Sequence, residues 1–590
     1  MVGEVRAAAV RSVRAAAVRS VRAAAVRVSS PGAMDFFQEP PRLGNQYDGD
    51  LLLRSWLERT LPEPVRRAIE PALREMGELA ATTLLELSTR SRREEPQLVS
   101  YDPWGRRIDE IRVPEAWRAF ARVAVEWGLV AIPHERTHGA FSRIHQGALV
   151  HLFGPSSSIY TCPLAMTDGA ATTLLAHGNA ALVERAVPRL TSRDPARAWT
   201  SGQWMTERTG GSDVGQTLTR AVRDAEGWRL HGTKWFTSAT TSEMALTLAR
   251  PEGNPGGGKG LALFYLELRR PDGTPNGVTV LRLKDKLGTR MLPTAEVDLE
   301  GALATPVIGL SDGVRAIAPM LQITRTWNAL CAVCSMRRGI ALARDFAGRR
   351  SAFGARLADK PLHVQTLAEL EAEYQAAFLL TFRLLELLGR VEAQEATEWE
   401  RRLVRTLQPV AKLVTGKQAV AHASEVLESF GGAGYVEDTG LPVLLRDAQV
   451  LPIWEGTTNV LSLDLLRALT GEGGLRDVDA ELSRALGAAT DAALAPVRTR
   501  ARALMDAAGG WFSVAHDSGP AQLEGGARRF ALAVGRSLQL ALMAEHAQWQ
   551  LGHGDRSGVA VAQQLVALSP VPDLLAVLSP DEARTAARLD

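Results

Sequence analysis

Residues 453–459 read IWEGTTN, and this stretch places one carboxylate, Glu455, between a large aromatic residue and a glycine. An apolar neighbour such as Trp454 disfavours the charged form of a carboxylate, so the group becomes a stronger base near neutral pH. Gly456 has no side chain, and its backbone can approach a ligand closely. The stretch therefore predicts a base beside a backbone hydrogen-bond donor.

Other motifs lie outside this stretch: MTERTGGSD at 205–213, KWFTS at 234–238, RRSAFG at 349–354 and FGGAGY at 430–435. Together with IWEGTTN they resemble the acyl-CoA dehydrogenase family, and within it the AidB-like branch of alkylation-response flavoproteins. The resemblance runs from about Met34 to about Thr470, and more loosely to the C-terminus. It implies an α+β multidomain fold with an N-terminal helical domain, a small antiparallel β-barrel domain, a C-terminal helical bundle and an extra C-terminal helical extension.

The spacing of apolar residues predicts where these domains begin and end. A period of about 3.6 residues indicates helices over 34–199, and again over 313–470, where we expect a four-helix bundle. Residues 200–312 contain short β-rich runs divided by Gly, Pro and Asp turns, which predicts a small barrel or sandwich. Residues 471–590 are rich in Ala, Gly and Leu and are typical of amphipathic helices joined by loops.

Residues 1–33 contain, over 5–27, a repeat of VRAAAVRS with a period of eight, which is neither a helical nor a strand period. They hold six arginines against one acidic residue. One interpretation is an over-extended gene start, with Met34 opening the folded protein. The other is an Arg/Ala/Ser-rich targeting or binding arm, low in complexity and disordered.

The overall composition is that of a soluble globular protein, with 46% hydrophobic and 23% charged residues and a net charge of +2. No apolar run of about twenty residues predicts a membrane span. The three cysteines are too few for a disulfide framework, which fits a reducing cytoplasm. We therefore expect a cytoplasmic protein that is not bound to a membrane.

The family resemblance implies an FAD-dependent oxidoreductase that acts on acyl-CoA thioesters. Such a reaction needs a base for the α-proton, a flavin that accepts the β-hydride at N5, and donors that stabilise the enolate-like charge. By resemblance Glu455 is the base, the Gly456 amide is one donor, and Arg325 is an active-site arginine. Some members carry the base on the helix of Arg325, but ITRTWN at 323–328 offers no carboxylate.

The resemblance also implies the cofactor contacts. Met205 and Thr206 are expected at the isoalloxazine and Ser212 toward the phosphate or acyl-CoA side, because a Gly-containing loop offers backbone N–H groups. Trp235 is expected against the flavin ring, and Thr237 near N5.

Further contacts are expected where the cofactor extends toward a second subunit. Arg350 and Phe353 hold the FAD pyrophosphate and adenine across a dimer interface in this interpretation, since an arginine fork pairs well with a diphosphate. The remaining expected contacts are Gly431, Gly432, Gly456, Thr457 and Asn459. We expect a homo-oligomer, a dimer of dimers, that passes electrons to an acceptor such as electron-transfer flavoprotein.

The substrate and the function leave alternatives open. Trp454 is bulkier than the tyrosine common in the family, which predicts a short or branched acyl-CoA. The alternative function is an AidB-like flavin-containing protein that binds double-stranded DNA and turns over little acyl-CoA; a non-catalytic flavoprotein scaffold is the third. DNA binding needs clustered Lys and Arg. Residues 471–590 hold eleven arginines and no lysine against fourteen acids, and their one dense basic cluster is Arg498, Arg500 and Arg502.

Two motifs suggest metal sites that we do not expect to form. His134 and His138 give a literal HExxH, but Pro133 and Gly139 flank it, so it is predicted to straddle a loop or a helix start rather than lie within one helix. Cys331 and Cys334 have CxxC spacing inside a helical apolar pattern and are interpreted as core thiols. No metal is predicted.

Overall fold

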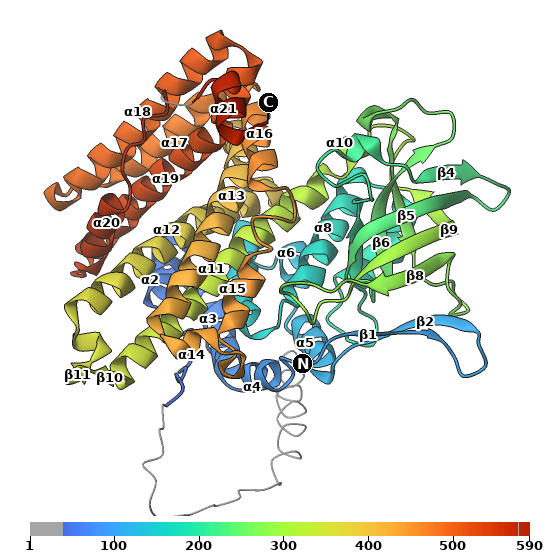
Figure 1. Cartoon of the computed structure of the whole chain (residues 1–590), viewed down its shortest axis with the longest axis horizontal. Helices are drawn as coiled ribbons and strands as arrows, with labels where there is room; N and C mark the ends of the chain where they lie inside the picture. Colours follow the sequence, from blue (N-terminus) through green and yellow to red (C-terminus); the bar gives the residue numbers. More distant parts are fainter. Residues whose placement is uncertain (1–38, 576–577, 590) are drawn as a thin grey trace, which may run out of the picture.

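The computed structural model describes residues 39–575 and 578–589. The predicted segment 1–33 and both of its interpretations lie outside the described residues. Along the chain follow a helical region, a β-barrel, a long-helix bundle and a helical extension (Figure 1). This arrangement confirms the predicted α+β fold class.

The first helical region packs beside the bundle and carries a protruding hairpin. Its elements are α2 (Leu51–Thr60), α3 (Glu63–Ala81), α4 (Thr83–Arg90), β1 (Gln97–Tyr101), β2 (Arg107–Arg112), α5 (Glu115–Glu126), α6 (Ala131–Glu135), α7 (Ser142–Phe153), α8 (Thr161–His177) and α9 (Ala180–Leu190). Helix α2 begins where the Asp50 side chain accepts a hydrogen bond from the Leu53 N–H, which satisfies one of the free donors of the first turn. It buries Trp56, whose ring contacts Phe382 edge-on at 5.1 Å between centroids and so ties this region to the bundle.

A seven-stranded sheet closes into the barrel, because β6 pairs with β7 as well as with β3 and β4. Its strands are β3 (Ser201–Trp204), β4 (Arg220–Arg223), β5 (Trp228–Ser238), β6 (Met244–Pro251), β7 (Ala262–Glu267), β8 (Val278–Leu283) and β9 (Thr294–Pro306). The pairings are antiparallel except for β3–β6 and β4–β6, which are parallel. The prediction of an antiparallel barrel is therefore right for most, but not all, of the sheet. The barrel has its own core, which includes Trp204, Leu230 and Phe264.

The bundle is built on long helices. The elements of this region are α10 (Gly313–Ala316), α11 (Ala318–Arg349), β10 (Ser351–Ala352), β11 (Ala355–Arg356), α12 (Pro361–Glu392), α13 (Glu398–Ser429), α14 (Gly432–Tyr435), α15 (Pro442–Ala448) and α16 (Thr458–Leu469). Helix α13 starts with a capping box between Thr397 and Glu400. The Thr457 side chain caps α16 by accepting from the Val460 N–H at 3.3 Å, which fixes the end of the IWEGTTN stretch.

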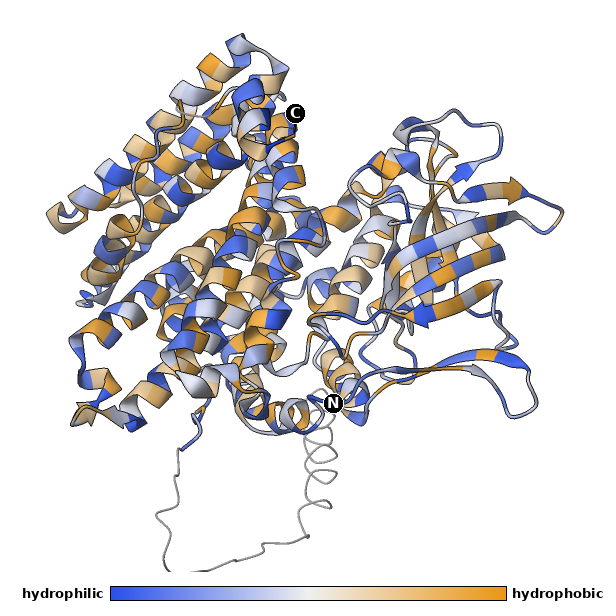
Figure 2. Cartoon of the chain, viewed as in Figure 1, coloured by the Kyte–Doolittle hydropathy of each residue, from blue (hydrophilic) through white to orange (hydrophobic). Residues whose placement is uncertain are grey.

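The extension lies against α12, α13 and α16 at one end of the molecule (Figure 1). Its helices are α17 (Gly474–Ala488), α18 (Ala495–Ser518), α19 (Pro520–Gly552), α20 (Ser557–Ala567) and α21 (Pro580–Ala587). Hydrophobic and hydrophilic residues alternate along these helices (Figure 2), and Leu482, Trp511 and Phe530 are buried in the core shared with the bundle. Buried Glu481 adds an ion pair to Arg383 of α12 at 2.8 Å. Within the described ranges, no helix is long and apolar enough to cross a bilayer.

Candidate active site

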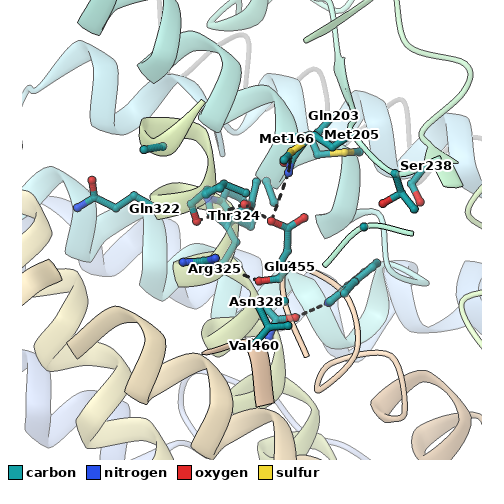
Figure 3. Close-up of a pocket in the computed structure, with 18 of the residues that line it drawn as sticks. Met166, Gln203, Met205, Ser238, Gln322, Thr324, Arg325, Asn328, Glu455 and Val460 are labelled. Atoms are coloured by element: carbon teal, nitrogen blue, oxygen red, sulfur yellow. Dashed lines mark hydrogen bonds between the residues drawn. The ribbon is translucent and has the colours of Figure 1, made fainter. Parts of the chain in front are cut away.

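A cavity of about 1420 Å³ opens between the barrel, helices α8 and α11, and the loop that precedes α16 (Figure 3). Part of its wall is apolar, with Ala165 and Met166 from α8 and Trp327 from α11. Residues predicted from separate motifs meet here. Those that line the cavity are Met205, Thr206, Ser212, Arg325, Glu455, Gly456 and Thr457.

The backbone at the centre of this loop is strained. Glu455 has a φ of 58° and Gly456 a φ of 101°, so consecutive residues lie at positive φ. This region suits glycine, but it costs a residue with a Cβ about 1 to 3 kcal/mol, and it persists only where neighbours hold it. The strain at Glu455 therefore indicates that contacts fix the loop.

The Glu455 carboxylate points into the cavity and accepts hydrogen bonds there (Figure 3). Its Oε2 lies 2.6 Å from the Thr324 hydroxyl and 3.4 Å from the Gln203 amide nitrogen. The indole of Trp454 turns aside, and its Nε1 donates to Oδ1 of Asn328. The carboxylate thus has polar neighbours that the sequence did not indicate.

Arg325 holds the backbone rather than the carboxylate of Glu455. Its Nε donates to the Glu455 carbonyl at 3.2 Å, and its Nη1 pairs with Asp464 of α16 at 2.8 Å. Arg405 pairs with the same carboxylate at 2.7 Å. Burial alone would raise the pKa of Asp464, but its bonds and charge interactions with Arg405 and Arg325 hold the pKa below its ordinary value. Arg325 is therefore held in one orientation beside the loop.

The loop of Met205 and Thr206 is fixed by a buried ion pair. Glu207 is buried and accepts from the Lys234 ammonium at 2.8 Å and from the Leu218 N–H at 2.6 Å. The Trp235 N–H donates to the Thr206 carbonyl at 2.9 Å. Strand β5 and Glu207 together hold the backbone of this loop at the cavity wall.

Strand β5 presents different residues to the cavity from those the sequence suggested. Neighbouring side chains of a strand point to opposite faces. Phe236 and Ser238 line the cavity. Trp235 lies under the Lys284 ammonium, 3.4 Å from its ring centroid, and buried Thr237 donates its hydroxyl to the Ala295 carbonyl at 2.9 Å. The two β5 side chains that line the cavity are therefore each one residue after the expected positions 235 and 237.

The remaining predicted residues do not line this cavity. Arg350 and Phe353 follow the far end of α11, roughly 36 Å along the helix from Arg325 at 1.5 Å per residue. Gly431 and Gly432 lie near that end too, because the neighbouring Phe430 ring packs on Phe346 with centroids 4.6 Å apart. Asn459 is also outside the cavity, with Oδ1 3.4 Å from Nη1 of Arg528 in the extension.

This far end is exposed and open. The Phe353 side chain is 99% exposed, and Tyr435 is 90% exposed. Gly431 has a φ of 59°, and a Cβ built on it would meet nothing within 4 Å. In the part of the chain that the structure describes, the Arg350 guanidinium has no ion-pair partner. Within one chain, this end cannot contribute to the cavity around Glu455.

The HExxH motif does not form one helical face. Helix α6 ends at Glu135, and Arg136 adopts a left-handed φ of 52° before His138 is reached. His134 is engaged with buried Asp168, 2.9 Å away. Of the two predicted alternatives, a loop or a helix start, the structure shows the loop, because the motif begins in α6 and continues beyond its end. Cys331 and Cys334 lie on α11. Cys334 is buried in the core as predicted, whereas Cys331 is half-buried and lines the cavity, and desolvation raises the pKa of its thiol to about 11.

The residues around the cavity suit a flavin. Gln203 has a buried Oε1 with no hydrogen-bond partner among the described residues, and it lies in the cavity wall beside the exposed loop of Thr206 and Ser212. Phe236 offers a half-exposed ring. Ser238 offers a hydroxyl (Figure 3). An unpaired polar atom, an open aromatic face and hydroxyl donors together form a set that a planar heteroaromatic ring with polar edges can satisfy.

Sequence reasoning missed the residues that support the motif residues. Thr324 and Gln203 contact the carboxylate, Glu207 anchors the flavin-side loop, and Lys412 of α13 donates to the Gly456 carbonyl. Strand alternation could have indicated Phe236 and Ser238, whereas the supporting contacts cross between distant elements and leave no local pattern.

Known families cover most of the described chain. Residues 38–195 match the Adaptive response protein AidB N-terminal domain, residues 202–302 the Acyl-CoA dehydrogenase middle domain, and residues 311–470 the Acyl-CoA dehydrogenase C-terminal domain. The chain is 46% identical over 447 residues to Acyl-CoA dehydrogenase family member 11 of Caenorhabditis elegans, covering 74% of this chain and 72% of the relative. It is 34% identical over 417 residues to the putative acyl-CoA dehydrogenase AidB of Escherichia coli, covering 68% and 74%.

Solved structures agree with these matches. The Caenorhabditis elegans ACDH-11 structure in complex with C11-CoA superposes with a TM-score of 0.92 and 39% identity, over 97% of this chain and 99% of that one. An acyl-CoA dehydrogenase from Bacillus anthracis complexed with FAD has the same fold, with a TM-score of 0.70 and 17% identity over 93% and 94%. By its domains, its relatives and its fold, this chain belongs to the acyl-CoA dehydrogenase family of FAD-dependent oxidoreductases.

Proposed function

We propose that this protein oxidises an acyl-CoA thioester and that Glu455 is the base that removes the α-proton. The observation that carries the proposal is the Glu455 carboxylate, held at 2.6 Å by Thr324 inside the cavity and directly followed by Gly456. In the described part of the chain the Gly456 N–H has no acceptor, so it is available to the carbonyl of a thioester. A base and an oxyanion donor on adjacent residues are what removal of an α-proton requires.

The reaction balances as a loss of two hydrogens from the substrate. Glu455 accepts the proton from the α-carbon while the electron pair of that C–H bond shifts toward the thioester carbonyl, whose charge the Gly456 N–H stabilises. Bound FAD would supply the acceptor for the hydride that leaves the β-carbon. A double bond forms between the α- and β-carbons, and Glu455 then releases its proton to solvent.

The cofactor ring would be held by residues on one side of the cavity. We assign Met205, Thr206 and Ser212 to it, with Phe236 against the ring and Ser238 at its polar edge in place of Trp235 and Thr237. The support is the lining of the cavity and the alternation of β5. Thr457 lies in the same wall and caps α16, which suits a role in shaping the loop.

The rest of the cofactor contacts would come from a second copy of the chain. Arg350 and Phe353 cannot reach the cavity of their own chain. The Phe353 ring is exposed, and Arg350 is half-buried with no ion-pair partner among the described residues. We propose that these residues, with Gly431 and Gly432, bind the pyrophosphate and adenine of the partner's FAD, as expected for a dimer or a dimer of dimers. We propose Asn459, which lies beside Arg528 of the extension, as a further contact of that FAD.

The acyl group would lie in the apolar part of the cavity, beside Ala165, Met166 and Trp327. The expectation of a short or branched chain came from Trp454, whose indole is tethered to Asn328 at the edge of the cavity. Because the related Caenorhabditis elegans structure holds C11-CoA, we propose a straight chain of medium length, with short and branched chains as the alternative. Electrons would pass on to a protein acceptor such as electron-transfer flavoprotein.

The DNA-binding alternative has less support. Its proposed basic cluster is engaged within the extension: Arg498 donates to the Asp491 carbonyl, Arg500 to the Val566 carbonyl, and Arg502 pairs with Asp479. Guanidinium groups that already have partners gain less from phosphates. The role in alkylation-damage response therefore remains a second hypothesis, based on the resemblance to AidB alone.

Turnover with an artificial electron acceptor tests the proposed function. A panel of straight and branched acyl-CoAs is incubated with the holoenzyme, and the products are analysed by mass spectrometry. We expect an enoyl-CoA that lacks two hydrogens, formed fastest from a straight chain of medium length. A panel in which no thioester is converted would favour the DNA-binding or the scaffold hypothesis.

A further inference from the structure

A charged side chain is buried in the bundle next to the active-site loop. Lys412 lies in the middle of α13, is 0% exposed, and places its Nζ 2.6 Å from the carbonyl oxygen of Gly456. Among the described residues this carbonyl is the only hydrogen-bond acceptor of the ammonium, and no carboxylate forms an ion pair with it. A buried ammonium with one neutral acceptor is costly. Helix packing alone would be served better by an apolar residue.

The charges around Lys412 come from the neighbouring elements. Glu455 on the loop stabilises the ammonium, Arg325 of α11 repels it, and Asp464 of α16 neutralises Arg325. The Lys412 side chain therefore faces the active-site loop and the residues that support it, and none of it is exposed to solvent.

Consecutive carbonyls of the strained loop are each held by a basic side chain. Arg325 donates to the Glu455 carbonyl at 3.2 Å, and Lys412 donates to the Gly456 carbonyl at 2.6 Å. In a trans peptide the C=O and the N–H point in opposite directions. The hydrogen bond from Arg325 to the Glu455 carbonyl therefore directs the Gly456 N–H away from α11. The hydrogen bond from Lys412 to the Gly456 carbonyl fixes the orientation of the next peptide, so both peptides that flank Gly456 are held.

We propose that Lys412 is a positioning residue, whose ammonium holds the Gly456 carbonyl and thereby keeps the Gly456 N–H directed at the thioester carbonyl. The inference rests on the proposed function, since it needs Gly456 as the oxyanion donor. Lys412 touches neither substrate nor cofactor. It acts by keeping positive φ at Glu455 and Gly456, a conformation that an unsupported loop would relax.

The test isolates proton removal from hydride transfer. A 3-thia-acyl-CoA has an acidic α-proton, but the sulfur at its β-position has no hydride to give, so the holoenzyme in D2O can exchange the α-hydrogen and do nothing more. The rate of exchange follows from mass spectrometry, and the affinity of the same compound follows from the change in flavin absorbance. Lys412→Met removes the donor, Lys412→Gln keeps an uncharged donor, and Lys417→Met, an exposed lysine of the same helix, is the control.

We expect Lys412→Met to exchange about tenfold more slowly, less than the loss of a whole oxyanion donor would cause, with the dissociation constant changed less than about twofold. Lys412→Gln is expected between Lys412→Met and wild type, and Lys417→Met at the wild-type rate. If Lys412→Met does not fold, the exchange rate of Lys412→Gln is compared with that of Lys417→Met, and a slower rate in Lys412→Gln is the expected result.

The inference is overturned if Lys412→Met exchanges as fast as Lys417→Met. It is also overturned if exchange falls only in proportion to lost affinity or lost flavin, because that is the behaviour of a merely structural residue. Glu455→Gln, measured in the same series, tests the role of Glu455 as the base separately from the positioning role of Lys412. Exchange that survives in Glu455→Gln contradicts the proposed base itself, whatever the lysine variants do.

Discussion

The hydroxyl of Thr324 donates a hydrogen bond of 2.6 Å to Oε2 of Glu455, which joins α11 to the active-site loop. The hydroxyl oxygen of Thr324 also lies 3.1 Å from the carbonyl oxygen of Met320 in its own helix. A hydroxyl has one proton and donates it to one acceptor at a time. The carboxylate and the helix carbonyl therefore compete for this proton, and the shorter distance favours the carboxylate.

Thr324→Val keeps the shape of the side chain and removes this donor. We expect kcat to fall about threefold to tenfold, the effect of one lost bond to a charged group. Thr326→Val is the control, since its hydroxyl donates to the Gln322 carbonyl of its own helix. Equal kcat values for the two variants would contradict the role of Thr324.

Phe236→Ala should weaken FAD binding, because its half-exposed ring lines the cavity. An aromatic contact of this kind contributes about 1 kcal/mol, so we expect the dissociation constant of FAD to rise about fivefold to tenfold. Trp235→Ala is the matched variant from the opposite face of β5. Flavin fluorescence after dialysis measures the FAD lost by each variant. A larger loss of FAD in Trp235→Ala than in Phe236→Ala would favour Trp235 as the residue against the flavin ring and contradict the assignment of Phe236.

Arg350 can be assigned to its own or the partner's site by mixing subunits. If each site combines Glu455 of one chain with Arg350 of the other, co-expressed Glu455→Gln and Arg350→Ala chains form some dimers in which one site has both defects and the other has none. We expect activity to reappear in the mixed protein, although each variant alone is nearly inactive. Activity no higher than the average of the two separate variants would place both residues in the same chain's site.

The stability of the protein should carry a pH signature of Lys412. Burial lowers the pKa of this lysine from 10.5 to about 7, with Glu455 opposing and Arg325 reinforcing the shift. Between these values the unfolded chain binds a proton that the folded chain does not, so the free energy of unfolding rises with pH. The cost of burying the charge is complete below about pH 7 and disappears toward pH 10.5.

Lys412→Met lacks this cost at every pH. We expect the free energy of unfolding of Lys412→Met to exceed that of wild type by the largest amount at or below about pH 7. The difference between the two proteins should shrink steadily above that pH. Urea unfolding at several pH values measures this difference. Loss of the bond to the Gly456 carbonyl adds the same amount at every pH, so it does not change the slope of the difference against pH. A difference that does not change with pH would show that Lys412 keeps its ordinary pKa.

The sequence predicted the fold and the centre of the site because both depend on local patterns. Apolar spacing separates helices from strands, and short motifs mark Glu455, Gly456 and the loop of Met205, which do meet in one cavity. The expected cofactor residues and the cavity-lining residues of β5 differ because a motif gives residue types but not the face of a strand. Trp235 attracted the prediction by its chemistry, whereas the period of two assigns the cavity to Phe236.

The supporting residues could not be predicted in this way. Thr324 and Lys412 sit inside long helices where a threonine is ordinary and a lysine suggests a solvated face, and only the packing of α11 and α13 on the loop gives them a role. Arg350 was expected at a subunit interface, and a single chain cannot test that expectation. What a sequence lacks here is the register between distant elements, which sets the direction of each side chain.

Anaerobic titration of the holoenzyme with acyl-CoA, followed by flavin absorbance near ~450 nm, tests the central claim most directly. The account predicts rapid bleaching of the wild-type protein by a thioester of the preferred chain length. Glu455→Gln should bind the same compound with full flavin but bleach at least about a thousandfold more slowly, because the proton has no acceptor. A wild-type flavin that no thioester reduces, or a Glu455→Gln variant that bleaches as fast as wild type, would contradict the account.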